Sequence, residues 1–322
     1  MNPHARQPPM RKRRERRFTK KSTDERKADG RYPPQQPAPK APKPKSAPFK
    51  PGGTAFQGKD VDFGGLAPRA EPEPTIAQGV DLAGKTKIVF AAGRGKTGKT
   101  TLPRWIAETS FQHGSTPILA DIDPSNASFS RYFDGTARPE TDNPAGVARW
   151  LQQLIIEHCV TEHQSAIVDL GGGDTTLRTL ASEMPGLAAA MEAAGVAPVM
   201  LYLLGTQPED LTPALTLSAR GFAPKAQALV LNEVAIDAGT TRADAFGRMT
   251  SLPGFIELAK TSVPVWMPRL FAAEAIEARQ CRFFDARDGK VAPPLGMFDG
   301  ARLRAWLDAM DRRLAGISSW IP

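Results

Sequence analysis

Cysteine is nearly absent from this chain of 322 residues, and so are long apolar runs. The two cysteines, Cys159 and Cys281, lie too far apart in the sequence to form a disulfide framework. His158 and His163 flank Cys159, but a five-residue spacing does not put both imidazoles on one helix face, so ordinary helix-end residues are expected there and not a metal site. Met1–Lys21 is charged and has no apolar stretch, which indicates no secretory signal and predicts a cytoplasmic protein.

One apolar run, Leu187–Leu204, is long enough to raise the question of a membrane span. Only Glu192 is charged, but Gly195 and Pro198 divide the run into the end of a helix and the start of a strand. Membrane spans need about 20 predominantly apolar residues, so a buried helix–strand unit is expected. The amphipathic stretch Ala301–Ile317 is only modestly basic, and we expect it to dock on its own sheet. No stable membrane insertion is predicted.

The net charge of +8 is unevenly distributed. Residues 1–80 contain 18 Lys and Arg, 8 Asp and Glu, and 14 of the 30 prolines, whereas the rest of the chain contains 24 basic and 26 acidic residues. A proline-rich, charged segment buries too little apolar area to offset an ordering cost of about 1–2 kcal/mol per residue. The sequence therefore predicts a disordered basic tail at residues 1–83 and a folded domain at residues 84–322.

The tail contains a dense cluster of positive charge. Arg11–Arg17 has six basic residues in seven positions, and Lys20 and Lys21 follow. Such a cluster displaces counterions from a phosphate backbone, which predicts salt-sensitive, non-specific contact with DNA through Arg11–Lys21. A merely solvated terminus, an acidic protein and a membrane surface remain alternatives.

Short apolar runs alternate with helix-like stretches from Gly84 onward. Helices are expected at Thr101–His113 and Val147–Cys159, and strands at Lys87–Ala92, Thr116–Asp123, Ser165–Leu170, Pro198–Leu204, Ala226–Leu231 and Val263–Met267. This alternation predicts an α/β fold, with a mostly parallel sheet flanked by helices on both faces. Ligands of such sheets bind beyond the carboxyl ends of the strands.

A glycine-rich turn follows the first expected strand. Gly93–Thr100 matches G-x-x-x-x-G-K-[ST] at every fixed position, with an apolar strand before it and a helix after it. Glycines let backbone N–H groups turn inward around phosphates, and the helix directs its N-terminus at them. Lys99 would reach the β- and γ-phosphates and the Thr100 hydroxyl would ligate Mg²⁺, so the pattern predicts a P-loop NTPase domain. The flanking strand and helix disfavour an ordinary Gly/Lys/Thr turn.

Three carboxylates are expected at the same edge of the sheet. Asp169 ends an apolar strand and is followed by Gly171–Gly173, at a place suited to a carboxylate that faces a metal ion. Asp121 and Asp123 alternate at the end of another strand, so they point to opposite sides and at most one faces a given ligand atom directly. A single Asp is common in turns, but three at strand ends in one P-loop domain favour a functional site.

Four segments come in the same order as in the deviant Walker A ATPases of the ParA/MinD type, which the chain resembles from about Lys85 to Pro322. They are Gly93–Thr100, which we call the phosphate loop, Asp121–Asn126, Ile167–Leu170 and Val230–Asn232. Within that family, three segments are more similar to the conjugal-transfer TraL and plasmid-stability StbB group, namely Asp121–Phe129, Arg269–Glu274 and Phe283–Asp285.

The resemblance implies a homodimer that closes over two ATP molecules and reopens on hydrolysis. It further implies that Asp123 positions the attacking water, that Asp121 and Asp169 serve the Mg²⁺ ion, and that Asn232 recognises adenine. The phosphates would be held by Gly93, Arg94, Gly95, Lys96, Thr97, Gly98, Lys99, Thr100 and Thr101.

The phosphate loop departs from the family motif K-G-G-x-G-K-[ST] at two positions. The first Lys of that motif reaches the partner's ATP, and here Arg94 takes its place while Lys96 replaces the second Gly. Arg94 could supply the cation in trans, as an arginine finger does, although Arg and Lys differ in shape and hydration. Alternatively, Lys96 takes over this role, or ATP hydrolysis is very slow. The expected catalytic residues are thus Asp123, Lys99 and Arg94.

These features together predict an ATP-binding and ATP-hydrolysing switch protein for plasmid maintenance, partition or conjugative transfer. It would dimerise on ATP and contact DNA, or a DNA-bound plasmid protein, through its tail. One alternative is a nucleotide-binding adaptor with little turnover that recruits a relaxase or secretion component. Another is an ATP-dependent enzyme of the CobQ/dethiobiotin-synthetase type, which the basic tail disfavours. GTP in place of ATP stays open.

Overall fold

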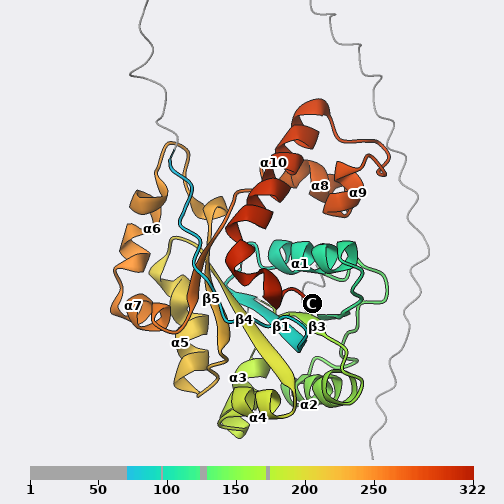
Figure 1. Cartoon of the computed structure of the whole chain (residues 1–322), viewed down its shortest axis with the longest axis vertical. Helices are drawn as coiled ribbons and strands as arrows, with labels where there is room; N and C mark the ends of the chain where they lie inside the picture. Colours follow the sequence, from blue (N-terminus) through green and yellow to red (C-terminus); the bar gives the residue numbers. More distant parts are fainter. Residues whose placement is uncertain (1–70, 96, 124–128, 172–174) are drawn as a thin grey trace, which may run out of the picture. The chain divides into compact units, whose positions relative to one another are not determined.

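Six parallel strands form one sheet in the order β2-β3-β1-β4-β5-β6 (Figure 1). The computed structural model describes residues 71–95, 97–123, 129–171 and 175–322. The strands span Thr86–Gly93 (β1), Ile118–Asp121 (β2), Ala166–Asp169 (β3), Val196–Leu204 (β4), Ala226–Asn232 (β5) and Val263–Met267 (β6). The predicted α/β fold with a parallel sheet is confirmed, and each strand lies at its expected place. The predicted tail, with its Arg11–Lys21 cluster, falls almost entirely outside the described residues.

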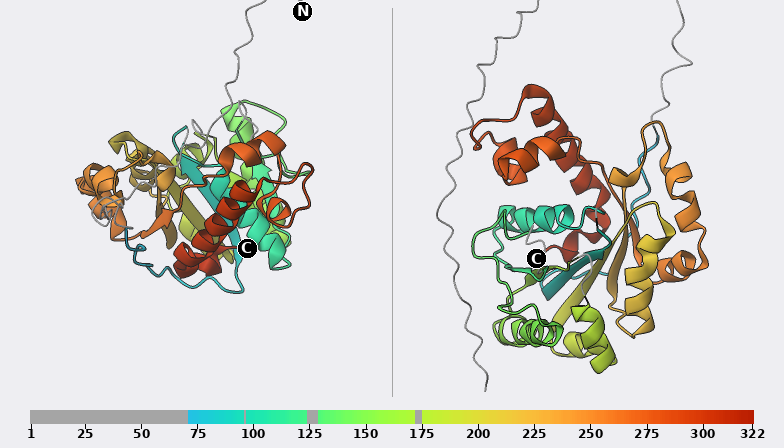
Figure 2. Two further views of the ribbon diagram at one scale, coloured as in Figure 1. Left: turned by 90° about the horizontal axis from the view of Figure 1, so that it is seen from above. Right: turned by 180° about the vertical axis from the view of Figure 1, so that it is seen from behind.

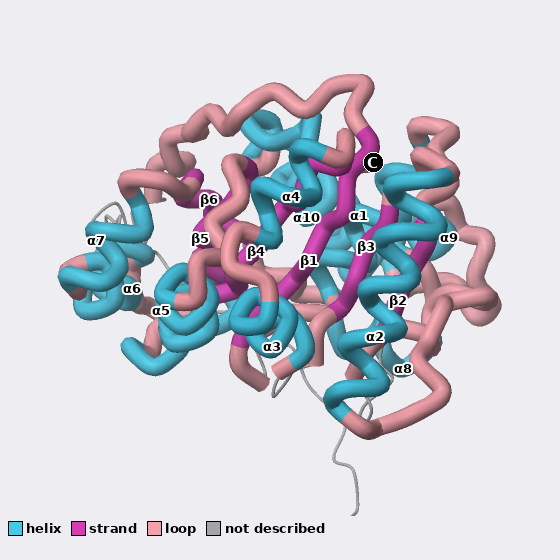
Figure 3. Tube along the Cα trace, turned by 90° about the horizontal axis from the view of Figure 1, so that it is seen from below, coloured by secondary structure: helices cyan, strands magenta, loops and turns pink. Residues whose placement is uncertain are grey.

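Helices cover both faces of the sheet (Figures 1 and 2). One apolar core joins the sheet to α2–α7, and a second joins its other face to α1 and α8–α10. The view from below places α3, α4 and α5 in front of the strands (Figure 3). The helices are α1 (Thr101–Gln112), α2 (Pro144–Leu154), α3 (Thr176–Glu183), α4 (Leu187–Ala193), α5 (Thr212–Ala219), α6 (Arg242–Thr250), α7 (Pro253–Ala259), α8 (Ala273–Arg279), α9 (Phe283–Arg287) and α10 (Met297–Arg313).

The central strand β1 shows why the segments expected to form strands are apolar at every position. Ile88 and Phe90 enter the core under α2–α7, whereas Val89 and Ala91 enter the core under α1 and α8–α10. Successive side chains of a strand point to opposite faces, so a strand buried on both faces needs apolar residues at every position. This position, between β3 and β4, puts the end of β1 at the middle of the carboxyl edge.

Local signals set the start of α2 but not its end. Asn143 caps the helix by accepting a hydrogen bond from Ala145 N at 3.1 Å, and proline occupies its first position. The helix then continues as a π-helical turn, Ile155–Thr161. Cys159 in this turn is fully buried, and the imidazole of His158 contacts Glu162 at 2.7 Å. Cys159 thus packs in the apolar core under α2–α7, and His158 pairs with Glu162, which directly follows the turn.

The C-terminal region docks on the sheet as expected. The helix starts four residues before the predicted Ala301, at Met297, and a 3-10 turn, Ala315–Trp320, follows it. Leu303 and Trp306 pack in the same core as strand β6, and Trp306 Nε1 donates to Pro268 O at 2.9 Å. In the part of the chain that the structure describes, no helix has the length and apolarity needed to cross a bilayer.

Residues 71–82, which we call the strap, pack against the C-terminal region although the sequence assigns them to the tail. Leu82 is buried, Gly79 N donates to Gly316 O at 2.9 Å, and Trp320 Nε1 donates to Val80 O at 2.7 Å. A Cβ at Gly316 would overlap the carbonyl oxygen of Ala77, so the two backbones touch. The packed part of the chain therefore extends N-terminal of the predicted boundary at Gly84.

Ion pairs fix the first residues of the strap. Glu73 accepts from Arg313 at 2.8 Å, and this hydrogen bond holds the pKa of the Glu73 carboxyl below its usual range. Arg313 also pairs with Glu233 at 2.6 Å, and Arg242 pairs with both Glu233 and Glu71. Glu233 directly follows β5, so this network reaches the carboxyl edge of the sheet.

Candidate functional site

Strand register brings the predicted site residues to one edge. Asp121, the last residue of β2, lies in register with Asp169, the last residue of β3, which in turn lies beside Ala91 of β1. Residues in register on neighbouring parallel strands point to the same face. Both carboxylates therefore lie on the face that α1 covers, next to the turn that leads from β1 into α1.

Thr100 and Asp169 form the closest contact of the site. The Thr100 hydroxyl donates to Asp169 Oδ2 at 3.0 Å, while Asp169 Oδ1 is buried and has no hydrogen-bond partner among the described residues. Burial, reinforced by the neighbouring charge of Asp121, raises the pKa of the Asp169 carboxyl to about 7. A buried oxygen without a partner costs free energy, and a bound hard cation would be the missing partner of this oxygen.

Asp121 and Asp123 serve different purposes. The Asp121 carboxylate accepts from Asp123 N at 3.2 Å and from Ser130 N at 3.0 Å, so it ties together both ends of the segment after β2. Asp123 lies against Gly171, where an added Cβ would stand 2.9 Å from the Asp123 carboxyl carbon. Glycine at position 171 thus lets Asp123 approach the end of β3.

These carboxylates do not form a ready-made metal cage. In the described ranges, no three Asp, Glu, His or Cys side chains are arranged to hold a metal ion by themselves. This fits Mg²⁺ in nucleotide sites, because Mg²⁺ usually takes one or two protein ligands and completes its shell with phosphate oxygens and water. Thr100 and Asp169, which are joined by a hydrogen bond, are described residues that could hold such an ion. The expected part of Asp121 in an Mg²⁺ site stays a prediction.

The phosphate loop is closed by contacts to one carbonyl. Arg94 O accepts from the Thr97 hydroxyl at 2.8 Å and from Lys99 Nζ at 3.1 Å. Burial lowers the pKa of the Lys99 ammonium, and the charges of Asp169 and Asp123 oppose this effect. The Lys99 ammonium therefore lies between the loop and the carboxylates, where it can turn toward a phosphate. Lys96 lies outside the described residues, so its predicted phosphate contact stays a prediction.

Asn232 braces the loop from β5. Its side chain is buried, with Nδ2 donating to Thr97 O at 2.8 Å and Oδ1 accepting from Val234 N at 3.1 Å. Gly98 has φ +82°, and a Cβ there would overlap Asn232 Nδ2. The amide thus holds the loop backbone in place, a role that the sequence did not predict. Adenine recognition by Asn232 stays a prediction.

Arg94 is held within its own subunit from the side of β4. Its guanidinium pairs with Asp210 at 3.5 Å, and half of its side chain stays exposed. Asp210 is itself fixed, because it accepts from Gln207 N at 3.2 Å and packs against Gly205. Sequence reasoning missed Asp210. The signal was the capping pattern Gln207-Pro-Glu-Asp210, which places a carboxylate just after a strand end.

Comparison with known proteins adds little to this geometry. No protein-family model matches the chain, and no curated protein matches it. Among solved structures, the cell division protein FtsY of Thermotoga maritima matches with a TM-score of 0.37 and 14% identity, over 60% of this chain and 65% of FtsY. The chain thus spans less than two thirds of FtsY. The fold therefore rests on the structure itself: six parallel strands with helices on both faces, and the Gly93–Thr100 motif between β1 and α1.

Proposed function

We propose that the chain binds ATP with Mg²⁺ at Gly93–Thr100 and hydrolyses it as the switch of a ParA/MinD-like protein. The observation that carries the proposal is the pair of Thr100 and Asp169 beside the loop, with one buried carboxylate oxygen left without a partner. A buried carboxylate oxygen without a hydrogen-bond partner would only destabilise a structural turn, whereas at a cation site it serves as a ligand. The bound Mg²⁺ would neutralise charge on the phosphate oxygens.

Each loop residue has a distinct task in this proposal. Backbone N–H groups at the start of α1 bind phosphate oxygens, aided by the helix dipole. Lys99 exchanges its contact with Arg94 O for a phosphate oxygen. Asp123, which lies next to Gly171, accepts a hydrogen bond from the attacking water and so orients it.

The finer part of the proposal concerns dimerisation and biological role. We propose that ATP closes two copies face to face, with the half-exposed Arg94 reaching the partner's phosphates. The protein would act in plasmid maintenance, partition or conjugative transfer, in contact with DNA through its tail. This part rests on the family resemblance of the loop and of the three motifs after it.

An adaptor that holds nucleotide with little turnover is the second candidate, and the ion pair of Arg94 with Asp210 favours it. A guanidinium held within its own subunit must break that pair before it acts in trans. Steady ATP hydrolysis by the purified protein, lost on Lys99→Ala, would reject the adaptor.

Calorimetry of the full-length protein with ATP·Mg²⁺ and GTP·Mg²⁺ tests nucleotide binding. Lys99→Ala should weaken binding at least about tenfold, since a charge-assisted hydrogen bond contributes about 1.5–3 kcal/mol. Lys260→Ala, which changes an exposed lysine after α7, is the matched control and should bind as the native chain does. Absence of binding of both nucleotides to folded native protein would overturn the proposal.

The dimer and the tail need separate measurements. Asp123→Ala should block hydrolysis and trap the dimer, so chromatography with ATP·Mg²⁺ should show a doubled mass, and an unchanged mass would count against the dimer. For DNA, the chain that begins at Glu71 is the right comparison, because it keeps the strap. Equal DNA affinity of this chain and the full-length chain would remove the tail from the proposal.

A further inference from the structure

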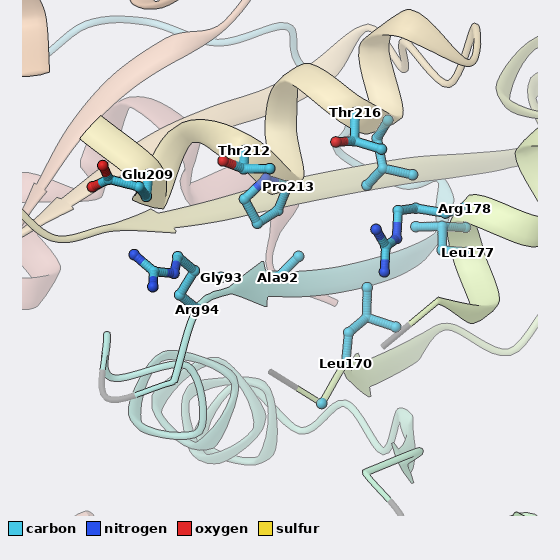
Figure 4. A pocket seen from close by; sticks show the side chains of 12 residues that line it. Ala92, Gly93, Arg94, Leu170, Leu177, Arg178, Glu209, Thr212, Pro213 and Thr216 are labelled. Atoms are coloured by element: carbon cyan, nitrogen blue, oxygen red, sulfur yellow. The ribbon is translucent and has the colours of Figure 1, made fainter. Parts of the chain in front are cut away.

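The phosphate loop is packed on only part of its surface. A cavity of about 300 Å³ borders Gly93 and Arg94, between the end of β1 and helix α5 (Figure 4). The lining of a cavity lacks the packing contacts that would otherwise hold it in place. The position of the loop therefore depends on its polar contacts, among them the hydrogen bond of 2.8 Å from Asn232 Nδ2 to Thr97 O.

The side chain of Asn232 is bonded at both ends of its amide group. Nδ2 holds the loop, while Oδ1 accepts from Val234 N at 3.1 Å and so caps the 3-10 turn Glu233–Ala235. The amide is planar, as a peptide group is, and Asn232 is only 2% exposed, so a shift at one end of the amide shifts the other. We therefore expect a displacement of the loop to be passed on to the turn that carries Glu233.

Glu233 joins this turn to the strap. One of its carboxylate oxygens, Oε1, pairs with Arg242 at 3.0 Å and with Arg313 at 2.6 Å. Arg313 also pairs with Glu73 at 2.8 Å. Arg242 also pairs with Glu71 at 3.4 Å, and its backbone N–H donates to the same carboxylate at 2.8 Å. A continuous series of contacts thus runs from the phosphate loop to the start of the strap, and we call the contacts of Glu71 and Glu73 the anchor.

The anchor is the weaker of the two attachments of the strap. Glu71 and Glu73 are exposed, and ion pairs of exposed groups contribute little because water and salt screen them. The second attachment consists of the buried Leu82 and backbone hydrogen bonds such as that of Gly79. Segments with few buried apolar contacts open most easily, so opening of the anchor alone costs less than opening of the whole strap.

We propose that the anchor closes more firmly when the phosphate loop is occupied, so that the nucleotide state of the loop is transmitted to the point where residues 1–70 join the strap. A bound triphosphate holds the loop, the Asn232 amide then fixes the turn, and Glu233 keeps both guanidinium groups in place for the anchor. This coupling rests on the proposed nucleotide binding. Because coupling is reciprocal, a closed anchor strengthens nucleotide binding by the same factor.

Amide exchange of Arg242, followed residue by residue by NMR on the full-length protein, measures the anchor directly. Arg242 is the first residue of α6, where N–H groups have no partner within the helix, and its N–H donates to Glu71. Asp244 N–H, in the same helical turn, donates to the Thr241 hydroxyl at 3.1 Å and is the matched control. Saturation with ATP·Mg²⁺ should slow exchange at Arg242 about fivefold or more and leave Asp244 unchanged. Unchanged or faster exchange at Arg242 would overturn the proposal.

A variant of Glu233 tests the route between the loop and the anchor. Glu233→Gln leaves the phosphate loop and the strap glutamates intact but removes the charge that Arg242 and Arg313 share. The variant should still bind ATP·Mg²⁺, but nucleotide should no longer slow exchange at Arg242. Glu257→Gln, at an exposed position on α7, is the matched control and should keep the nucleotide effect. The full effect in Glu233→Gln would overturn the route.

Reciprocity gives a second measurement, on a variant altered only at exposed side chains. The double variant Glu71→Gln, Glu73→Gln removes both charges of the anchor. In calorimetry it should bind ATP·Mg²⁺ more weakly than the native chain, by the factor by which nucleotide slows exchange at Arg242. Native affinity of the double variant would contradict the coupling.

Measurements without nucleotide keep this proposal apart from the proposed function. Raising the salt concentration from about 0.1 M to 1 M should speed exchange at Arg242 but not at Asp244, because salt screens the ion pairs of the anchor. No response to salt would show that ion pairs do not hold the anchor. If neither ATP nor GTP binds, the proposed function and the coupling both fail. If a nucleotide binds and exchange at Arg242 does not respond, only the coupling fails.

Discussion

The buried carboxylate of Asp169 is energetically unfavourable in the protein without a ligand. Its Oδ2 accepts from Thr100 while Oδ1 is buried without a partner in the described structure, and burial with the nearby Asp121 raises the pKa of its carboxyl to about 7. Functional sites often retain such local costs because the ligand removes them. The sequence predicted the position of Asp169 from the end of a strand, but not this balance, which depends on depth of burial.

Asp169→Asn should therefore stabilise the protein and impair the site. The amide can still accept from Thr100 but removes a buried charge beside Asp121, so the midpoint of thermal unfolding measured without Mg²⁺ should rise. Affinity for ATP·Mg²⁺ should fall, since a neutral amide is a poorer Mg²⁺ ligand. Asp142→Asn, at an exposed position, should change neither quantity. A lower unfolding temperature would show that the Asp169 carboxylate is compensated in the free protein.

Gly98→Ala tests the brace between Asn232 and the loop. Gly98 has φ +82° and no room for a Cβ against Asn232, whereas Gly114 has φ +79° and open space around it. Gly114→Ala is thus a matched control, and each change should cost about 1–2 kcal/mol of unfolding free energy for the backbone conformation alone. Only Gly98→Ala should also weaken nucleotide binding in calorimetry. Equal binding by both variants would mean that the brace does not shape the loop.

At the scale of elements, α1 connects two regions. It begins at the phosphate loop, and its buried Arg104 donates to Glu277 at 2.8 Å and to Cys281 O at 3.0 Å. Its Glu108 accepts from Phe283 N at 3.0 Å and from Phe284 N at 2.9 Å. The helix thereby bonds to α8 and to the start of α9, which are far away in sequence.

Glu108 should make stability depend on pH. Burial raises the pKa of its carboxyl to about 7, against the opposing effect of the two backbone N–H donors. A carboxyl with a raised folded-state pKa binds more protons when folded, so its contribution is fully present below about pH 4.5 and is lost as pH rises through about 7. The contribution amounts to about 3 kcal/mol at most.

Denaturant unfolding at several pH values between 4.5 and 8 measures this effect. Glu108→Gln should flatten the fall in stability over that range relative to the native chain, and should lower stability at low pH because its NH₂ group cannot accept the second backbone hydrogen bond. An unchanged slope would assign the pH dependence to other groups.

The elements were predictable to different degrees. Strands β1 and β4 could be predicted because burial on both faces requires an unbroken apolar run, and α1 because the motif precedes it. The π-helical end of α2 and the strap could not, since π turns have no local signature and the strap is polar and rich in proline. Contacts such as Asn232 with Thr97, 135 residues apart, depend on strand order, which the sequence pattern did not specify.

At the scale of the whole chain, the stability of the protein should depend on whether the strap is present. A chain that begins at Gly84 loses the buried Leu82, the hydrogen bonds to Gly316 and Trp320, and the ion pair of Glu73 with Arg313. Burial of a leucine side chain alone contributes about 1.5–3 kcal/mol. The chain that begins at Gly84 should therefore unfold at a lower denaturant concentration than the chain that begins at Glu71. Equal midpoints would show that the strap adds nothing to stability.

The contacts that join α1 to α8 and α9 also affect how these helices move together. Arg104 lies 3.3 Å from the ring centre of Tyr132 and 4.3 Å from that of Phe283, so the helix is clamped by aromatic rings as well as hydrogen bonds. Close-packed interiors transmit displacement and do not absorb it. We therefore expect a displacement of the first turn of α1 to be transmitted along the helix to α8 and α9. Amide exchange in α8 and α9, far from any phosphate, should slow when the loop is occupied.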